Sequence, residues 1–368
     1  MKSVYILFLS ILFLAPICQA THLKGGEIRA EHINGQTYKI TVRLYLDAQI
    51  GAGATAAQSS VPVCFGDGNT SELQRASSTP LSDNSGILAT DYVGTYTYPA
   101  SGTYQISSTV DNRSTGMLNL ENSGSSFVFL WTVINTQLAN STPALPYLSF
   151  NAGIRQIFSV DLKPTLADAD SISIRLQKLS KPSPGTCGVR MIEHAYKYPN
   201  EISNSGTFKI LAAEKKLVWQ APEIAGSYLF AMVVDEWRDG IIISQTYREG
   251  TIEVTDRPGP TVEVPPYESV ENGGPITSTP GTSPEISMSV EAYPVPTQDF
   301  LTVKAYSKKR SLIKLQLIDL SGRVIREISS DTPVINMQEE LDMRNLSKGV
   351  YLIRAANDVE SVSKKVVR

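Results

Sequence analysis

The chain has 368 residues and a formal net charge of −3, and 42% of its residues are hydrophobic. Charge is unevenly divided: residues 291–368 carry 13 basic and 10 acidic side chains, a net of +3, whereas residues 21–290 carry 19 and 26, a net of −7. A net of +3 spread over 78 residues is too dilute for the basic face of a nucleic-acid-binding protein, so we expect no nucleic-acid partner.

The first twenty residues have the pattern of a signal peptide for export. Lys2 provides a positive start, residues 4–17 are almost wholly apolar, and Cys18-Gln19-Ala20 places small residues where signal peptidase reads them. About 14 apolar residues are fewer than the roughly 20 that span a bilayer, and the usual residues before an acylated cysteine are missing at Cys18. We therefore expect cleavage after Ala20 and no transmembrane segment in the mature chain.

Cleavage after residue 20 would leave 348 residues, a suitable length for two or three domains. Two cysteines would remain, Cys64 and Cys187. Export to an oxidising space permits a disulfide, so one bridge between them and two buried thiols are both open interpretations. In either case hydrophobic cores have to stabilise the domains.

Nearly every segment after residue 21 alternates apolar and polar residues with a period of two, between turn-forming residues, as half-buried antiparallel strands do. The clearest early case is QTYKITVRLY at residues 36–45. The residues expected on one face of this strand are Tyr38, Ile40, Val42 and Leu44, and those expected on the other are Lys39, Thr41 and Arg43. Because convincing helical periodicity is missing, the sequence predicts an all-β fold.

One segment, residues 257–286, breaks this pattern. It contains seven of the chain's 21 prolines and four glycines, and almost no large apolar side chains, which is typical of an extended, solvated linker. In the body before it, a loop-like stretch near residues 135–142 predicts a division into two β-sandwiches. The predicted units are a signal peptide at 1–20, sandwiches at 21–137 and 138–256, the linker at 257–286 and a small C-terminal β-sandwich at 287–368.

Two segments of the first half carry a family resemblance. Residues 61–70, VPVCFGDGNT, run from a strand into a tight turn in which Asp67-Gly68 suits a positive φ. Residues 98–104, YPASGTY, follow later in the chain. The order of F-G-D-G and Y-x-x-x-G-x-Y resembles the PKD-type β-sandwich family, with Val63 where tryptophan is usual. The resemblance implies a PKD-like sandwich for the first half.

The start of the predicted mature chain, Thr21-His22-Leu-Lys-Gly25-Gly26-Glu27, resembles a group of exported Bacteroidota proteins that begin H-x-x-G-G-E. The chain has three histidines, and none has a partner at metal-ligand spacing. We therefore expect His22 to serve the first strand structurally.

The second half combines an Asp168-Ala-Asp170 turn, the segment LVWQAP at residues 217–222 and a strand that begins GSY at residue 226. In these features it is similar to cadherin-like or immunoglobulin-like extracellular modules, many of which bind Ca²⁺ through acidic turns. Calcium needs six to eight oxygen ligands, and Asp168, Asp170 and Asp256 are the visible candidates. These are too few, so we expect no cofactor and keep calcium as the weaker alternative.

Signatures of catalysis are missing. The sequence contains neither a G-x-S-x-G nucleophile motif nor an H-E-x-x-H zinc motif, and Cys187 with His194 has no recognisable orienting partner. Asp235, Glu236 and Asp239 have the composition of a glycosidase pair, but we interpret them as the end of a hairpin with Arg238 offsetting the carboxylates. We therefore expect the protein not to be an enzyme.

The C-terminal segment carries four motifs in a set order: YPVP at 293–296, DLSGRV at 319–324, LSKGVY at 346–351 and KVV at 365–367. They resemble the type A C-terminal sorting domain of the Bacteroidota type IX secretion system, with Val295 where asparagine is usual. The positions that match the family's motifs are Tyr293, Pro294, Pro296, Asp319, Gly322, Arg323, Gly349, Tyr351 and Lys365.

This resemblance implies that the folded tail is recognised by the type IX secretion machinery at the outer membrane and is cleaved off in transit. The body is then released or attached to surface lipopolysaccharide. We expect a secreted or cell-surface protein that binds or adheres without catalysis, with a glycan or protein as its ligand. The alternatives are an accessory or degenerate enzyme of polysaccharide hydrolysis and a structural component of the cell surface or of gliding motility.

Overall fold

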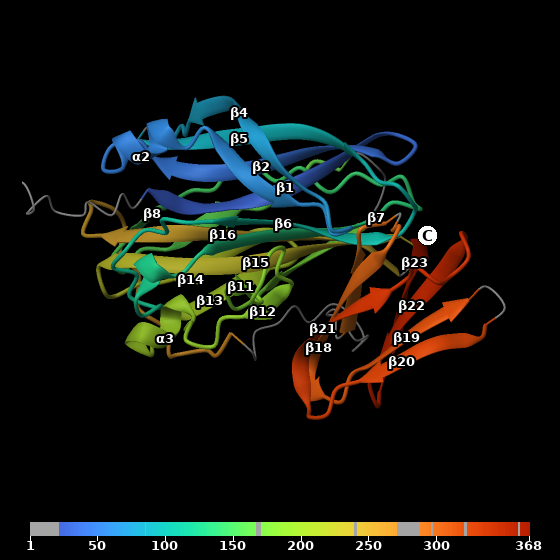
Figure 1. Ribbon diagram of the computed structural model, residues 1–368. Coiled ribbons are helices and arrows are strands. Elements are labelled where there is room, and N and C mark those ends of the chain that lie inside the picture. The colour runs from blue at the N-terminus through green and yellow to red at the C-terminus, as the bar shows by residue number, and fades with distance from the viewer. Residues whose placement is uncertain are drawn as a thin grey trace, which may run out of the picture.

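The computed structural model describes residues 22–84, 86–166, 171–238, 241–270, 288–295, 297–319, 322–359 and 361–368. The predicted signal peptide and its cleavage site after Ala20 lie outside these ranges. Within them, no helix has both the length and the apolar character needed to cross a membrane. Strands account for most of the described chain, which confirms the predicted all-β class (Figure 1).

The strands before residue 138 are β1 (Leu23–Asn34), β2 (Thr37–Asp47), β3 (Ser60–Cys64), β4 (Thr70–Pro80), β5 (Ile87–Thr97), β6 (Thr103–Val110) and β7 (Val128–Asn135), with the short helix α2 (Ala52–Ala57) and the 3-10 turn η1 (Ser123–Ser125). The alternation of β2 shows why these segments are strands. Its apolar residues from Tyr38 to Leu44 are fully buried, whereas the polar residues between them are half-buried. The predicted two faces of this strand are confirmed.

The elements between residues 138 and 256 are β8 (Asn151–Gly153), β9 (Phe158–Asp161), β10 (Ser171–Leu176), β11 (Ser180–Pro182), β12 (Arg190–Ile192), α3 (Pro199–Ser203), β13 (Thr207–Leu211), β14 (Lys216–Gln220), β15 (Gly226–Arg238) and β16 (Ile241–Thr255). The two longest, β15 and β16, pair as one antiparallel hairpin. Asp235 and Glu236 lie near its turn, as the hairpin interpretation predicted.

One large sheet joins both halves of the body. Its path runs β1-β2-β5-β4-β3-β6-β7-β16-β15-β10, and β1 also pairs with β16, so the path from β1 to β7 closes through β16. β8, from the second half, pairs with the same strand. Figure 1 shows β1, β2, β4 and β5 as one layer above β6, β15 and β16. The predicted segments 21–137 and 138–256 therefore share a sheet.

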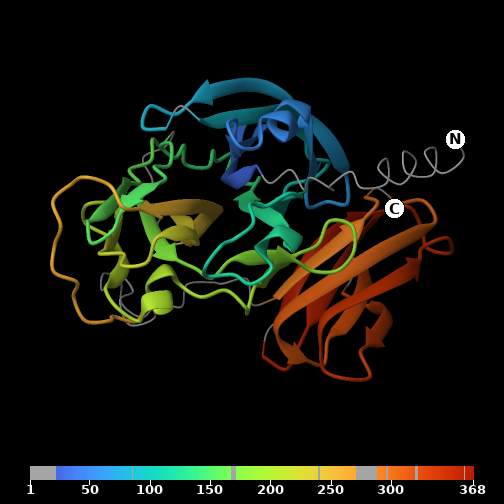
Figure 2. The same cartoon turned by 90° about the vertical axis from the view of Figure 1, so that its left-hand side faces the viewer.

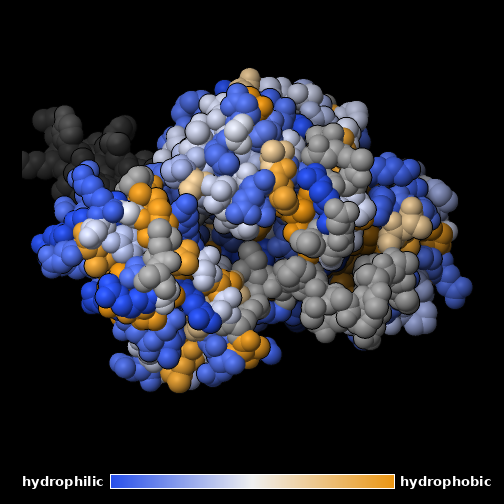
Figure 3. Space-filling model, turned by 90° about the vertical axis from the view of Figure 1, so that its right-hand side faces the viewer, coloured by the Kyte–Doolittle hydropathy of each residue, from blue (hydrophilic) through white to orange (hydrophobic). Residues whose placement is uncertain are grey.

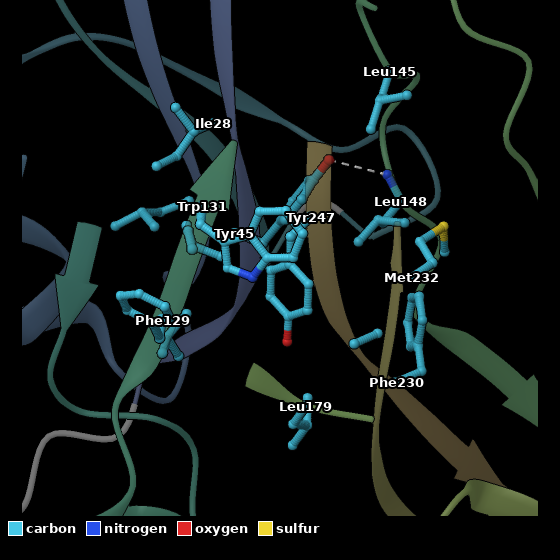
Figure 4. Packing of buried hydrophobic residues seen from close by; sticks show 14 of the residues in the cluster. Ile28, Tyr45, Phe129, Trp131, Leu145, Leu148, Leu179, Phe230, Met232 and Tyr247 are labelled. Carbon is cyan, nitrogen blue, oxygen red and sulfur yellow. Dashed lines mark hydrogen bonds between the residues drawn. The ribbon is translucent and has the colours of Figure 1, made fainter. Parts of the chain in front are cut away.

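The two halves also share a hydrophobic core, which extends from Leu23 to Val254. In Figure 4, Trp131 of β7 and Tyr247 of β16 lie face to face, with ring centres 5.4 Å apart. The backbone N–H of Leu148 donates to the Tyr45 hydroxyl across the same cluster (3.3 Å). Each half therefore buries apolar surface against the other.

The residues of the H-x-x-G-G-E segment close this sheet. Gly25 and Gly26 face β16, and a Cβ at Gly25 would lie 2.2 Å from the carbonyl oxygen of Glu249. The next residue, Glu27, accepts a hydrogen bond from Arg248 Nε (2.7 Å) in the interior of the body. Two glycines let the backbones approach, and the glutamate then neutralises a buried arginine.

The first half of the predicted linker is attached to the body. Residues 257–270 contain no strand or helix, yet Val262 N donates to Arg155 O (2.8 Å) and Gly206 N donates to Pro265 O (2.9 Å). Composition predicted a solvated tether, whereas backbone hydrogen bonds to loops distant in sequence hold this stretch in place. Figure 2 shows it as a long loop along the edge of the body.

The C-terminal domain, residues 288–368, is a separate pair of sheets. It contains β17 (Met288–Tyr293), β18 (Phe300–Ser311), β19 (Lys314–Asp319), β20 (Val324–Ser329), β21 (Val334–Asp342), β22 (Val350–Ala356) and β23 (Ser361–Val367). The sheet orders are β17-β18-β21 and β20-β19-β22-β23, and every strand pair found for them among the described residues stays within the domain. The core between the two sheets shares no residue with that of the body, so this domain has what it needs to fold by itself.

Candidate functional site

The first C-terminal motif lies where the domain begins. Tyr293 is the last residue of β17 and pairs with Thr302 of β18. Lys304 Nζ lies 5.3 Å from the centre of the Tyr293 ring. Pro294 is exposed beyond the end of the strand, where the missing N–H of a proline removes no ladder hydrogen bond. Pro296 lies outside the described residues.

The second motif forms the turn between β19 and β20. Gly322 has a φ of +85°, which favours glycine, and its N–H donates to Asp319 O (3.0 Å). The Asp319 carboxylate accepts hydrogen bonds from the backbone N–H (3.0 Å) and from Nε (3.2 Å) of Arg323. The aspartate, glycine and arginine of this motif thus build one turn.

The third motif and the chain end belong to the hairpin of β22 and β23. Gly349 and Arg368 exchange backbone hydrogen bonds of 3.1 Å and 2.9 Å. The Tyr351 hydroxyl donates to Ser347 O (2.6 Å) from a buried ring. Lys365 is exposed on β23. The motif residues therefore lie in separate turns and strands of one domain.

Sequence reasoning missed Lys364, the neighbour of Lys365. Lys364 Nζ donates to the carbonyl oxygen of Gly66 in the body (3.1 Å) and lies 5.4 Å from the centre of the Tyr104 ring. In an alternating strand, Lys364 shares a face with the apolar residues Val362 and Val366. The one sequence signal for Lys364 was its position on the apolar face of the strand, two residues from Val362 and two from Val366.

Two further contacts join the C-terminal domain to the body. Gly68 has a φ of +95°, and a Cβ placed on it would lie 1.8 Å from Tyr293 Cβ, so the tyrosine packs directly on the glycine. Lys304 Nζ donates to the carbonyl oxygen of Thr186 (2.7 Å). The predicted positive φ in the F-G-D-G turn is confirmed, and this turn is part of the contact.

A disulfide connects the two body segments that receive these contacts. Cys64 immediately precedes the turn of Gly66 and Gly68, and Cys187 immediately follows Thr186. The two cysteines form a bridge with a Cα–Cα distance of 5.5 Å across a sequence separation of 123 residues. Of the two interpretations left open by the sequence, the structure therefore supports the disulfide.

A cavity of about 740 Å³ lies between the body and the C-terminal domain, and residues of both line it. In Figure 3 a hollow separates the two parts on this side of the molecule. Burial raises the pKa of Glu291, which lines the cavity, to about 7, while Lys364 and Lys304 act to lower it and Asp67 to raise it. Burial lowers the pKa of Lys364. This contact therefore contains charged groups with little solvation.

A second cavity of about 750 Å³ lies on the body beside the disulfide. Its lining includes Pro62, Cys64, Phe127, Pro184 and Cys187, and the Phe127 side chain is 47% exposed. An open cavity with a large apolar side chain at its edge suits a ligand that offers apolar or ring surfaces.

Among the acidic residues that the sequence singled out, those in the described ranges lie apart or are engaged by partners, and Asp239 lies outside these ranges. Asp235 is buried and bonds to Arg175 (3.2 Å), and Glu236 is buried and accepts a hydrogen bond from Asn140 (2.7 Å). Asp256 is exposed, while the other calcium candidates, at 168 and 170, lie outside the described residues. In the described ranges, no three His, Cys, Asp or Glu side chains are grouped to hold a metal ion.

Comparison with known proteins bears on the C-terminal domain. Residues 291–368 match the model of a family described as a secretion system C-terminal sorting domain. No curated protein matches the chain. A solved structure described as "Biofilm associated protein - BSP domain" is similar at 8% identity over 100% of this chain and 69% of that one, with a TM-score of 0.18, too low to bear on fold or function. The matched C-terminal family supports the identification of this protein as a substrate of type IX secretion.

Proposed function

We propose that this protein is exported by type IX secretion and that its body then acts as a non-catalytic binding or adhesion module on the cell surface or in the medium. The observation that carries the export half is the sorting-domain match at residues 291–368, on a domain with its own sheets and core. In this proposal the partners are the secretion machinery, surface lipopolysaccharide as an anchor, and a glycan or protein ligand.

Two features of the body support the proposal that it binds a ligand without catalysis. Asp235 and Glu236, the carboxylates nearest in composition to a glycosidase pair, are 2% and 0% exposed and are engaged by Arg175 and Asn140. Buried and partnered carboxylates do not reach a polysaccharide substrate. The cavity beside the disulfide, with Phe127 exposed at its edge, is the candidate ligand site.

Export is tested in the native cells by comparing the full chain with a chain that ends at residue 287. Because the body has its own core, we expect the shortened chain to fold and to remain in the periplasm, while the full chain leaves it. In a complementary fusion protein, residues 288–368 are joined to an unrelated periplasmic reporter, which should then be exported. Arrival of the shortened chain at the cell surface would contradict the proposal.

Binding is tested on the purified body with a glycan array and with whole cells. We expect Phe127→Ser to weaken binding and Ile33→Ser to leave it unchanged, since these side chains are similarly exposed, at 47% and 48%, but only Phe127 lines the cavity. An equal loss of binding in both variants would show that this cavity is not the ligand site. Hydrolysis of an array glycan by the body would favour the enzyme alternative.

A further inference from the structure

The contact between the body and the C-terminal domain centres on one lysine side chain. Lys364 Nζ donates to the carbonyl oxygen of Gly66 and lies above the ring of Tyr104. Burial lowers the pKa of Lys364, and the carboxylates of Glu291, in its own domain, and Asp67, in the body, act to raise it. A carbonyl oxygen, an aromatic face and a negative charge are the groups that recognise an alkylammonium ion. We call Gly66, Asp67 and Tyr104 the lysine dock.

The residues of the lysine dock are held in place by contacts within the body itself. The Asp67 carboxylate is 3% exposed and accepts hydrogen bonds from Asn69 N (3.0 Å) and from the Tyr96 hydroxyl (2.5 Å). Gly66 has a φ of +85°, and a Cβ there would lie 2.5 Å from a carbonyl oxygen of the neighbouring strand. These contacts aim the Gly66 carbonyl and leave little room for the turn to rearrange.

The aromatic wall of the lysine dock is equally fixed. The Tyr104 ring stacks on Tyr98 with ring centres 4.2 Å apart, and its hydroxyl donates to Ala100 O (2.7 Å). The ring therefore has no freedom to turn away from the cation. A preformed site loses little conformational entropy when the lysine binds.

We propose that the lysine dock is a binding site for a lysine side chain, that Lys364 of the last strand fills it in the intact chain, and that the sorting domain is thereby held against its own cargo. Tyr293 on Gly68 and Lys304 on Thr186 complete the docking surface. The disulfide links the two body segments that carry this surface. It therefore keeps the docking surface together as one unit.

Docking of this kind is reversible. In the residues that the structure describes, the two parts share no strand pairing and no core residue, and a cavity of about 740 Å³ remains between them. A few polar contacts around an unfilled cavity resemble a transient interface rather than an obligate one. If the protein is exported as proposed above, the faces of β17 and β23 become accessible to the secretion machinery when Lys364 leaves the lysine dock.

The first test measures how fast each lysine of the purified, oxidised full chain reacts with an amine-acetylating reagent, read by peptide mass spectrometry. Lys364 and Lys365 are neighbours, but Lys365 is exposed on the opposite face of β23. If the dock is filled about nine-tenths of the time, only the open fraction reacts, and Lys364 acetylation is slowed about tenfold. Reaction of Lys364 as fast as Lys365 would overturn the proposal.

The isolated domain, residues 288–368, supplies the control, because its sheets and core are complete without the body. We expect the protection of Lys364 to disappear there. Equally slow acetylation in the isolated domain would show that the domain itself shields the lysine, and the lysine dock would be rejected. Protection in the full chain that grows with protein concentration would assign the dock to a second copy and overturn the intramolecular docking.

The second test compares Lys364→Met with Lys365→Met in the full chain, and its readout is the acetylation rate of Lys304. Methionine keeps most of the aliphatic length and removes the charge. We expect Lys304 to react several-fold faster in Lys364→Met alone, because loss of docking also frees its contact with Thr186. Equal Lys304 rates in the two variants would refute the role of Lys364. Both tests use purified protein, so their failure leaves the export assay in cells unaffected.

Discussion

The pKa of Glu291 predicts how the stability of the C-terminal domain depends on pH. Glu291 is 8% exposed, and burial raises its pKa from 4.5 to about 7. The folded domain therefore binds a proton more tightly than the unfolded one. This contribution to stability is fully present below about pH 4.5 and is lost as the pH rises through about 7. A shift of this size corresponds to about 3 kcal/mol.

We therefore expect the free energy of unfolding of the domain in Glu291→Gln to be nearly constant from pH 4.5 to 8. In the wild type it should fall by up to about 3 kcal/mol over that range. The three tryptophans, at 131, 219 and 237, all lie in the body. Tryptophan fluorescence therefore reports on unfolding of the body. Unfolding of the C-terminal domain in urea should be followed by circular dichroism, as a transition without a fluorescence change.

A matched control is Glu327→Gln in the same domain. Glu327 is exposed on β20, and hydrogen bonds from Gln316 and Lys314 lower its pKa. Replacing Glu327 should therefore leave the wild-type pH dependence of the domain's free energy of unfolding unchanged. The reasoning would be refuted if the wild-type domain were as stable at pH 8 as at pH 4.5, or if Glu291→Gln kept the wild-type slope.

Three further substitutions in the body should lower its stability, measured by tryptophan fluorescence in urea. Arg248→Met removes the closer of the two arginines that face the buried Glu27 carboxylate and leaves Arg43 at 3.7 Å, so it should cost about 3 kcal/mol, the lower end for a broken buried pair; no loss would show that Arg248 is not needed to neutralise Glu27. Cys64→Ser opens a loop of 123 residues and should cost about 5 kcal/mol, and a matching loss on reduction of the wild type would confirm the bridge. Gly25→Ala should cost more than Gly35→Ala, which has open space for a Cβ; equal costs would contradict the close approach.

Much of the fold could be predicted from local patterns. The alternation from Tyr38 to Leu44 correctly predicted both faces of β2, because the side-chain period of a strand is independent of its partners. The positive φ at Gly68 and the turn at Gly322 followed from their glycines. The motif order from Tyr293 to Lys365 predicted the sorting domain that the family match supports.

The docking contact could not be predicted in this way. Lys364 and Gly66 are 298 positions apart, and no periodicity relates a lysine on the last strand to a carbonyl in an early turn. The bridge between Cys64 and Cys187 was one of two open interpretations, because its formation depends on which loops the fold brings together. The attachment of residues 257–270 to the body was missed for the same reason: it depends on backbone groups that composition does not describe.

By itself, the sequence determined the β class, the separate C-terminal domain and its turns, since these depend on residues close together along the chain. Only the tertiary structure decided that residues 21–137 and 138–256 share one sheet through β16. It also decided that the C-terminal domain lies on the disulfide-linked turn. Strand partners and docking surfaces are chosen by the burial and hydrogen bonding of residues far apart in sequence, and local alternation carries no record of that choice.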